Sequence, residues 1–130
     1  MSWLVADPGL RTLGDALALT PDLLAGYRVL EQALAADPEL DGALRARCRA
    51  RVALLLGVPG DHYPSGSGAD DVVLELVEQL VLDAHGVSDD LVARVRSVLS
   101  PRAIVTLAQA VVVWEGQYRL ARCLDVAPEL

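Results

Sequence analysis

The residues best suited to acid–base chemistry lie in one apolar stretch near the C-terminus, where Glu115 and Tyr118 follow a run of valines. An ionised carboxylate among apolar side chains is costly unless it is paired or lines a cavity. Glu115 and Tyr118 are therefore candidate catalytic groups, and their neighbours Trp114 and Gln117 are candidate substrate-binding residues. The alternative for Glu115 is an ion pair with Arg119, four residues further along the same helix.

The two histidines offer a second source of proton transfer. His62 lies in the sequence Asp61-His62-Tyr63, where Asp61 is placed to orient the imidazole of a catalytic His62 and Tyr63 to contact a substrate. The alternative for these residues is an exposed polar loop. His85 precedes Gly86 at the expected end of a helix, where an imidazolium interacts favourably with the helix dipole, and this predicts a structural role.

The remaining residues of redox or metal-binding type are too dispersed to form a site by spacing alone. Cys48 and Cys123 lack the short spacing of a redox pair or of a zinc ligand set, so we expect two reduced thiols and no metal. The acidic residues Glu75, Glu78 and Asp83 have no histidine in matching register, which favours a solvated acidic face. We predict no cofactor.

Charge excludes one class of partner. The chain has a net charge of −7, and phosphate binding depends on clustered cations, so we predict no nucleic-acid partner. An alternating run of arginines at positions 45, 47, 49 and 51 is the exception. Successive residues of a helix step by about 100°, so this run favours solvated faces and ion pairs over a phosphate or carboxylate clamp.

Positioning these residues requires helices. Apolar residues recur at spacings of three and four, and each periodic segment has its own start and stop signals. Thr20-Pro21-Asp22 and Ser100-Pro101 are two of the start signals. The segment 57–69 concentrates Gly, Pro and Ser without apolar periodicity and predicts a flexible loop. The expected helices span about 20–36, 41–56, 70–86, 88–99 and 100–121.

The whole chain of 130 residues is expected to form a single all-α domain, a compact bundle of about five to six helices. The last helix is apolar on nearly every side, so we expect a dimer or higher homo-oligomer that uses this helix in its interface. No segment has the apolar length of a membrane span and the N-terminal residues do not resemble a signal peptide, so we predict no membrane partner and a cytoplasmic protein.

A family resemblance adds to this reading. Five short elements follow one another in order. They are Val77-Glu78-Gln79-Leu80, Gly86-Val87-Ser88-Asp89-Asp90, Leu99-Ser100-Pro101, Gly116-Gln117-Tyr118 and, near the C-terminus, Leu124-Asp125-Val126. From about Asp71 onward this order resembles the second half of carboxymuconolactone decarboxylase and alkylhydroperoxidase-D-like proteins. Leu19 to Tyr27 and Leu40 to Val52 are similar to two earlier helices of that family. The resemblance implies an alkylhydroperoxidase-D-like helical fold.

The same resemblance does not extend to the segment that carries the family's active-site residues. The helix that carries Cys-x-x-Cys or Glu-x-x-x-His in that family is replaced here by residues 57–69. The leading hypothesis is a cofactor-free lyase, isomerase, cyclase or decarboxylase acting on a small hydrophobic or carboxylate-bearing substrate. A non-catalytic relative that binds a hydrophobic molecule or a partner enzyme, and a thiol peroxidase-like redox protein, are the alternatives.

Overall fold

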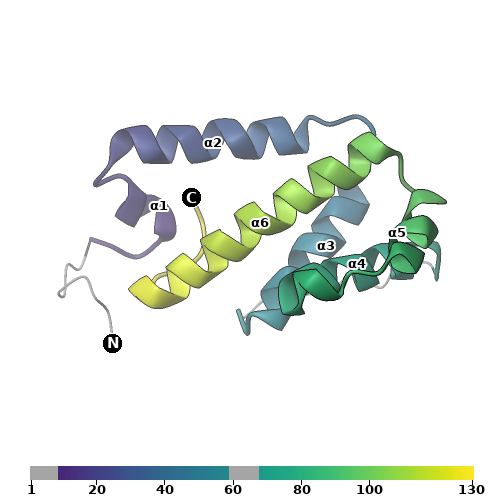
Figure 1. The fold of residues 1–130 in the computed structure, drawn as a ribbon. Coiled ribbons are helices and arrows are strands. Elements are labelled where there is room, and N and C mark those ends of the chain that lie inside the picture. The colour runs from purple at the N-terminus through teal and green to yellow at the C-terminus, as the bar shows by residue number, and fades with distance from the viewer. Residues whose placement is uncertain (1–8, 59–67) are drawn as a thin grey trace.

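A computed structural model describes residues 9–58 and 68–130 (Figure 1). Their regular structure is entirely helical, with six α-helices and two short 3₁₀ helices, so the predicted all-α bundle of five to six helices is confirmed. The α-helices are α1 (Leu13–Leu17), α2 (Pro21–Ala35), α3 (Gly42–Leu55), α4 (Asp71–Leu82), α5 (Asp89–Arg96) and α6 (Pro101–Leu124). The 3₁₀ helices are η1 (Gly68–Asp70) and η2 (Ala84–Gly86).

Helix α6 is the axis of the bundle. It runs diagonally through Figure 1 with α3 behind it and α2 alongside, and it contacts α1, α2, α3, α4 and α5. Its buried side packs on the inner faces of α3 and α4, where Cys48, Val52, Val73 and Val77 are fully inaccessible to solvent. The core is made almost wholly of aliphatic residues, which suits close packing between helices.

The helix starts follow the capping signals in the sequence. The side chains of Asp41, Ser88 and Ser100 each accept a hydrogen bond from a backbone N–H in the first turn of α3, α5 and α6. These bonds satisfy backbone donors that a helix start otherwise leaves unpaired. Thr20 precedes α2 with no such side-chain bond, and Pro21 supplies the favourable first-turn residue there instead.

Helix α2 departs most from the predicted pattern. The spacing of three and four aligns Leu23 and Leu30 with Leu34 on the helix, but these two side chains are 51% and 36% exposed. Within its fifteen residues α2 buries only Leu34, while Tyr27 is partly buried. Helix α2 therefore packs on the bundle along one narrow edge.

The first helix and the C-terminal segment hold each other in place. Leu13 N–H donates to the Ala127 carbonyl at 2.7 Å, and Ala127 N–H donates to the Arg11 carbonyl at 2.9 Å. Gly14 N–H adds a third bond, to the Glu129 carbonyl at 2.8 Å. A Cβ atom on Gly14 would lie 2.5 Å from the backbone carbon of Leu130, so only glycine permits this approach.

Among the described helices, no single one combines the length and apolar character of a bilayer span. Helices α5 and α6 meet those criteria only when joined, and they are bent by 118° at their junction.

Candidate functional site

A pocket of about 270 Å³ opens between α2, α3 and α6. Small side chains on α3 create the space, because Gly42 and Ala46 lie on the side of α3 that faces α2. Trp114 of α6, which is 3% exposed, supplies one wall. The lining residues are Glu31, Leu34, Ala35, Gly42, Arg45, Ala46, Arg49 and Trp114.

Two polar side chains of the lining, Glu31 and Arg49, continue to Tyr118 of α6, which lies outside the lining. Oε1 of Glu31 on α2 lies 3.5 Å from Nη2 of Arg49 on α3. Nε of Arg49 donates a hydrogen bond to the Tyr118 hydroxyl of α6 at 3.0 Å, and the guanidinium carbon lies 5.9 Å from the centre of the Tyr118 ring. One guanidinium thus joins a carboxylate of α2 and a phenol of α6.

The Glu31 carboxylate is incompletely satisfied in this arrangement. Its Oε1 atom is buried, and at 3.5 Å from Arg49 it has no hydrogen-bond partner within residues 9–58 and 68–130. A buried polar atom without a hydrogen bond is costly, and such atoms are rare in folded proteins. A ligand or water with a proton to donate would complete the coordination of Glu31.

Arg45 brings a second cation to the same pocket. Its Nη1 donates to the carbonyl of Ala35 at 3.1 Å, at the C-terminal end of α2 where the helix dipole favours positive charge. Arg45 and Arg49 are one turn apart on α3, so both point to the α2 side of that helix. Two guanidiniums beside an apolar wall suit a carboxylate attached to an apolar body.

The other two arginines of the alternating run have a different role. Arg47 pairs with Asp70 of η1, and Arg51 pairs with Glu78 of α4. The run therefore divides into two faces of α3, one toward the pocket and one toward α4, and each arginine joins α3 to another element. The expected ion pairs are present at Arg47, Arg49 and Arg51, whereas Arg45 is bonded to a backbone carbonyl.

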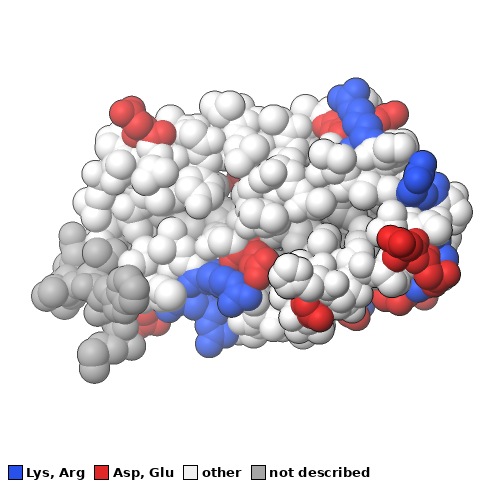
Figure 2. Space-filling view, in the orientation of Figure 1, with Lys and Arg blue, Asp and Glu red and all other residues white. Residues whose placement is uncertain are grey.

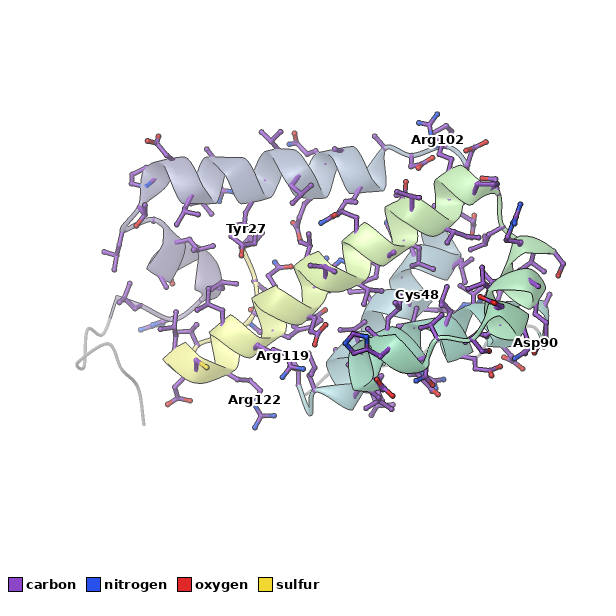
Figure 3. All side chains as sticks on the ribbon, viewed as in Figure 1. Tyr27, Cys48, Asp90, Arg102, Arg119 and Arg122 are labelled. Carbon is purple, nitrogen blue, oxygen red and sulfur yellow. The ribbon has the colours of Figure 1, made fainter. Side chains whose placement is uncertain are left out.

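Of the predicted site residues on α6, Trp114 lines the pocket, Tyr118 is bonded to the lining residue Arg49, and Glu115 does neither. Glu115 forms the alternative ion pair, with its Oε1 2.7 Å from Nη2 of Arg119, on a side of α6 that does not line the pocket. Figure 3 shows Arg119 and Arg122 on the C-terminal half of α6. The i, i+4 spacing had indicated this pair.

Gln117, a predicted substrate-binding residue, is buried away from the pocket. Its side chain is 0% exposed, and neither amide atom has a hydrogen-bond partner in the described part of the chain. It lies on the same side of α6 as Trp114 and Ala121, which are three residues before it and four after it. Gln117 does not line the pocket, so its buried amide is separate from the Glu31–Arg49–Tyr118 chain.

The remaining candidate residues fall outside the pocket or outside the described residues. His62 and Tyr63 lie between residues 59 and 67, which the structure does not describe. His85 is exposed in η2, at the end of α4. On the acidic side of α4, Glu75 lies 3.0 Å from Arg94 and Glu78 pairs with Arg51.

The two cysteines are unpaired and differ in their surroundings. Cys48 is buried inside the bundle, as Figure 3 shows, whereas Cys123 is exposed. Burial raises the pKa of Cys48 to about 12, against the smaller opposing effect of the Arg47 and Arg51 guanidiniums. A peroxidatic cysteine reacts as a thiolate, so the protonated Cys48 is unsuited to that chemistry. Among the described side chains, no three His, Cys, Asp or Glu residues gather as a metal-binding group.

Sequence reasoning missed Glu31, and it favoured solvated faces and ion pairs over a carboxylate clamp for the arginine run that includes Arg49. One local signal was present, because Arg45 and Arg49 stand at i, i+4 with the small residues Gly42 and Ala46 on the same side of α3. The partner Glu31 belongs to another helix, and no spacing rule within one helix connects it with Arg49.

A larger hollow of about 520 Å³ lies near the C-terminal segment, lined in part by Val58, Ala121 and Arg122. The Arg122 guanidinium is already bonded to the Leu56 and Gly57 carbonyls, both at 2.9 Å. The pocket at Arg49 is therefore the better candidate, since it holds two guanidiniums beside an apolar wall. In comparisons with known proteins, no family model, no curated protein and no solved structure matches this chain.

Proposed function

We propose that this protein binds a small carboxylate-bearing molecule with an apolar body in the pocket between α2, α3 and α6. The observation that carries the proposal is the pairing of Arg45 and Arg49 beside the wall of Trp114. The hydrogen bond from Arg49 to Tyr118 engages one of the five N–H groups of its guanidinium, and the contact with Glu31 is an ion pair at 3.5 Å, which leaves donors for a ligand carboxylate. The pocket volume of about 270 Å³ limits the ligand to a small molecule.

The test compares benzoate with benzamide, a neutral molecule of nearly the same shape. We expect benzoate, and not benzamide, to raise the melting temperature and change tryptophan fluorescence, because only benzoate pairs with the guanidiniums. Arg49→Met should abolish both effects, whereas Arg96→Met, on exposed α5 surface, should retain them. Equal binding of benzamide, or unchanged benzoate binding by Arg49→Met, would refute the proposal.

A second candidate function is acid–base catalysis on the bound molecule without a cofactor, as in a lyase or isomerase. The observation that favours it is that a carboxylate, Glu31, and a phenol, Tyr118, flank the same guanidinium. Glu31 would accept a proton and the Tyr118 hydroxyl would donate one to a developing negative charge that Arg49 stabilises. Glu115, paired with Arg119, is the matched carboxylate outside the pocket.

The natural ligand is best identified by native mass spectrometry of the protein purified from its producing cell. With that molecule as substrate, Glu31→Gln should lower turnover by about a hundredfold or more if Glu31 transfers a proton, and Glu115→Gln should leave turnover unchanged. If the ligand is released chemically intact after long incubation, the protein is a binding protein and the catalytic candidate fails.

We further propose that the protein is cytoplasmic and has no nucleic-acid partner. Two unpaired cysteines and a net charge of −7 support these proposals. Kinship with the carboxymuconolactone decarboxylase-like proteins also stays a proposal, supported by the elements from Asp71 onward, and the ligand proposal does not depend on it.

A further inference from the structure

Two neighbouring helices present an uncharged face to solvent. On α2 this face consists of Leu23, Gly26, Leu30 and Ala33, and on α6 it consists of Val105, Gln109, Val112 and Gly116. We call these eight residues the α2–α6 seam. Figure 2 shows the region over α2 and α6 as largely white, with blue and red side chains toward its margins.

The seam contains large apolar side chains that the fold leaves accessible. Val105 and Val112 are 70% and 62% exposed, and Leu23 is 51% exposed. Two shallow hollows follow the seam, one at Leu23, Gly26 and Leu30 and the other at Ala33, Val105 and Gln109. Apolar residues gathered on one face, with charges at its margins, are typical of a protein interface.

Helix α2 is weakly held by its own chain. It buries only Leu34 among fifteen residues, and most of the stability of a helix in a protein comes from burying an apolar face. A second layer of helices over the seam would bury Leu23 and Leu30, two apolar side chains that the chain itself leaves exposed.

Two positions in the seam are glycines although no contact within one chain requires glycine there. A Cβ atom on Gly26 or Gly116 would meet no atom within 4 Å, so nothing in the described fold requires glycine at either position. Glycine inside a helix is unfavourable unless another backbone approaches closely. Close contact with the backbone of a second chain would explain glycine at both positions.

Charged side chains of both signs stand at the two ends of the seam. Asp37 and Glu39 lie at its α6 N-terminal end, where Nε of Arg102 is 3.5 Å and 3.6 Å from them. Arg119, labelled in Figure 3, lies toward the other end, where it pairs with Glu115. Val105 and Arg119 are equally far from Val112 along the chain, since 112 − 105 equals 119 − 112. An antiparallel crossing at Val112 therefore brings Arg119 of each copy to the acidic end of the other.

We propose that two copies of this chain pair through the α2–α6 seam about a two-fold axis at Val112. The two α6 helices cross antiparallel, and Gly116 of each copy lets them approach closely. The occupant of the seam is a second copy because the face is uncharged in a chain of net charge −7 and its end charges complement themselves under a two-fold rotation.

The first test is the mass in solution, measured by sedimentation across micromolar to millimolar concentrations. We expect twice the chain mass of 13.8 kDa for the unaltered protein. Val112→Arg should raise the dimer dissociation constant by more than about tenfold, because it places two like charges at the axis. Leu82→Arg is the matched control, since Leu82 is 69% exposed but lies on α4, outside the seam, and this variant should remain dimeric.

The second test fixes the axis. In a Cys123→Ser background, oxidation of Val112→Cys should link two chains, because a residue on the axis faces its own copy, whereas Val105→Cys should not. Circular dichroism distinguishes a lost interface from a lost fold in every variant. A protein that stays monomeric at all concentrations, or a dimer that persists in Val112→Arg, overturns the proposal. Cross-linking through Val105→Cys but not Val112→Cys overturns the proposed axis.

Discussion

The Arg49 guanidinium donates a hydrogen bond to the Tyr118 hydroxyl at 3.0 Å, and this bond ties α3 to α6 at the edge of the pocket. The two residues are 69 positions apart in the chain. One interaction therefore contributes to the packing of the two central helices and also orients the cation that we propose binds the ligand.

Replacing Tyr118 by Phe should destabilise the fold by about 1 kcal/mol, because the ring stays in the core while Arg49 loses an acceptor. Urea unfolding measures this change. Tyr27→Phe is the matched control, since it removes a phenol hydroxyl from a partly buried ring on α2, and it should change stability by less. Equal effects of the two substitutions would show that the Arg49 bond contributes nothing measurable.

Replacing Gln117 by Met should stabilise the protein by roughly 1–3 kcal/mol. Methionine has nearly the same length, and it removes an amide that is fully buried without a hydrogen-bond partner in the described residues. Gln117→Glu is the companion variant, and it should be strongly destabilising because it buries a charge. A loss of stability in Gln117→Met, measured by urea unfolding, would mean that the amide holds a bound water or ligand.

Replacing Thr106 by Val should weaken the dependence of stability on acid pH. The Thr106 hydroxyl donates to Asp37 and is the largest cause of the lowered pKa of that carboxyl, followed by the Glu39 backbone N–H. A lowered pKa means that the folded state binds fewer protons than the unfolded state. The resulting stability is fully present above the ordinary value of 3.8 and is lost as pH falls through the folded pKa.

Unfolding measured between neutral pH and pH 2 checks this, together with the titration of Asp37 followed by NMR. In Thr106→Val the pKa of Asp37 should rise toward its ordinary value, so the variant should lose less stability than the parent protein on acidification. Asp15, whose pKa is lowered mainly by the backbone N–H of Arg11, should titrate unchanged. An unmoved Asp37 titration would contradict the assigned cause.

Only one thiol should react in the folded protein. Cys123 is exposed and Cys48 is buried with its pKa raised to about 12, so a disulfide reagent should label Cys123 rapidly and Cys48 only on unfolding. Absorbance of the released thiolate, with and without urea, measures both phases, and Cys123→Ser should remove the fast phase alone. A reversible Cys48–Cys123 disulfide seen by intact mass would revive the redox alternative.

The helices were predictable because their signals are local. Ser88 and Ser100 cap α5 and α6 where the sequence placed helix starts, and Cys48 and Val52 face inward as the spacing of three and four indicated. Helix α1 was missed because it is only five residues long, and its capping box between Thr12 and Asp15 has no apolar repeat to mark it.

The site was less predictable because its contacts join separate helices. The Glu115–Arg119 pair lies within one helix, so i, i+4 geometry anticipated it, whereas Glu31 and Arg49 meet only after α2 and α3 dock. The exposure of Leu23 and Leu30 was missed for a related reason. Amphipathic spacing shows which face of a helix is apolar, but a partner must be known before that face can be called buried.

The bonds from Leu13 and Gly14 to Ala127 and Glu129 bear on the order in which the helices form during synthesis. Synthesis on the ribosome releases α1 first, but its backbone partners leave the exit tunnel only after α6 has been made. Helix α1 has five residues, too few to be stable alone in water. We therefore expect α1 to form only after every other helix has been made, when it docks on the C-terminal segment.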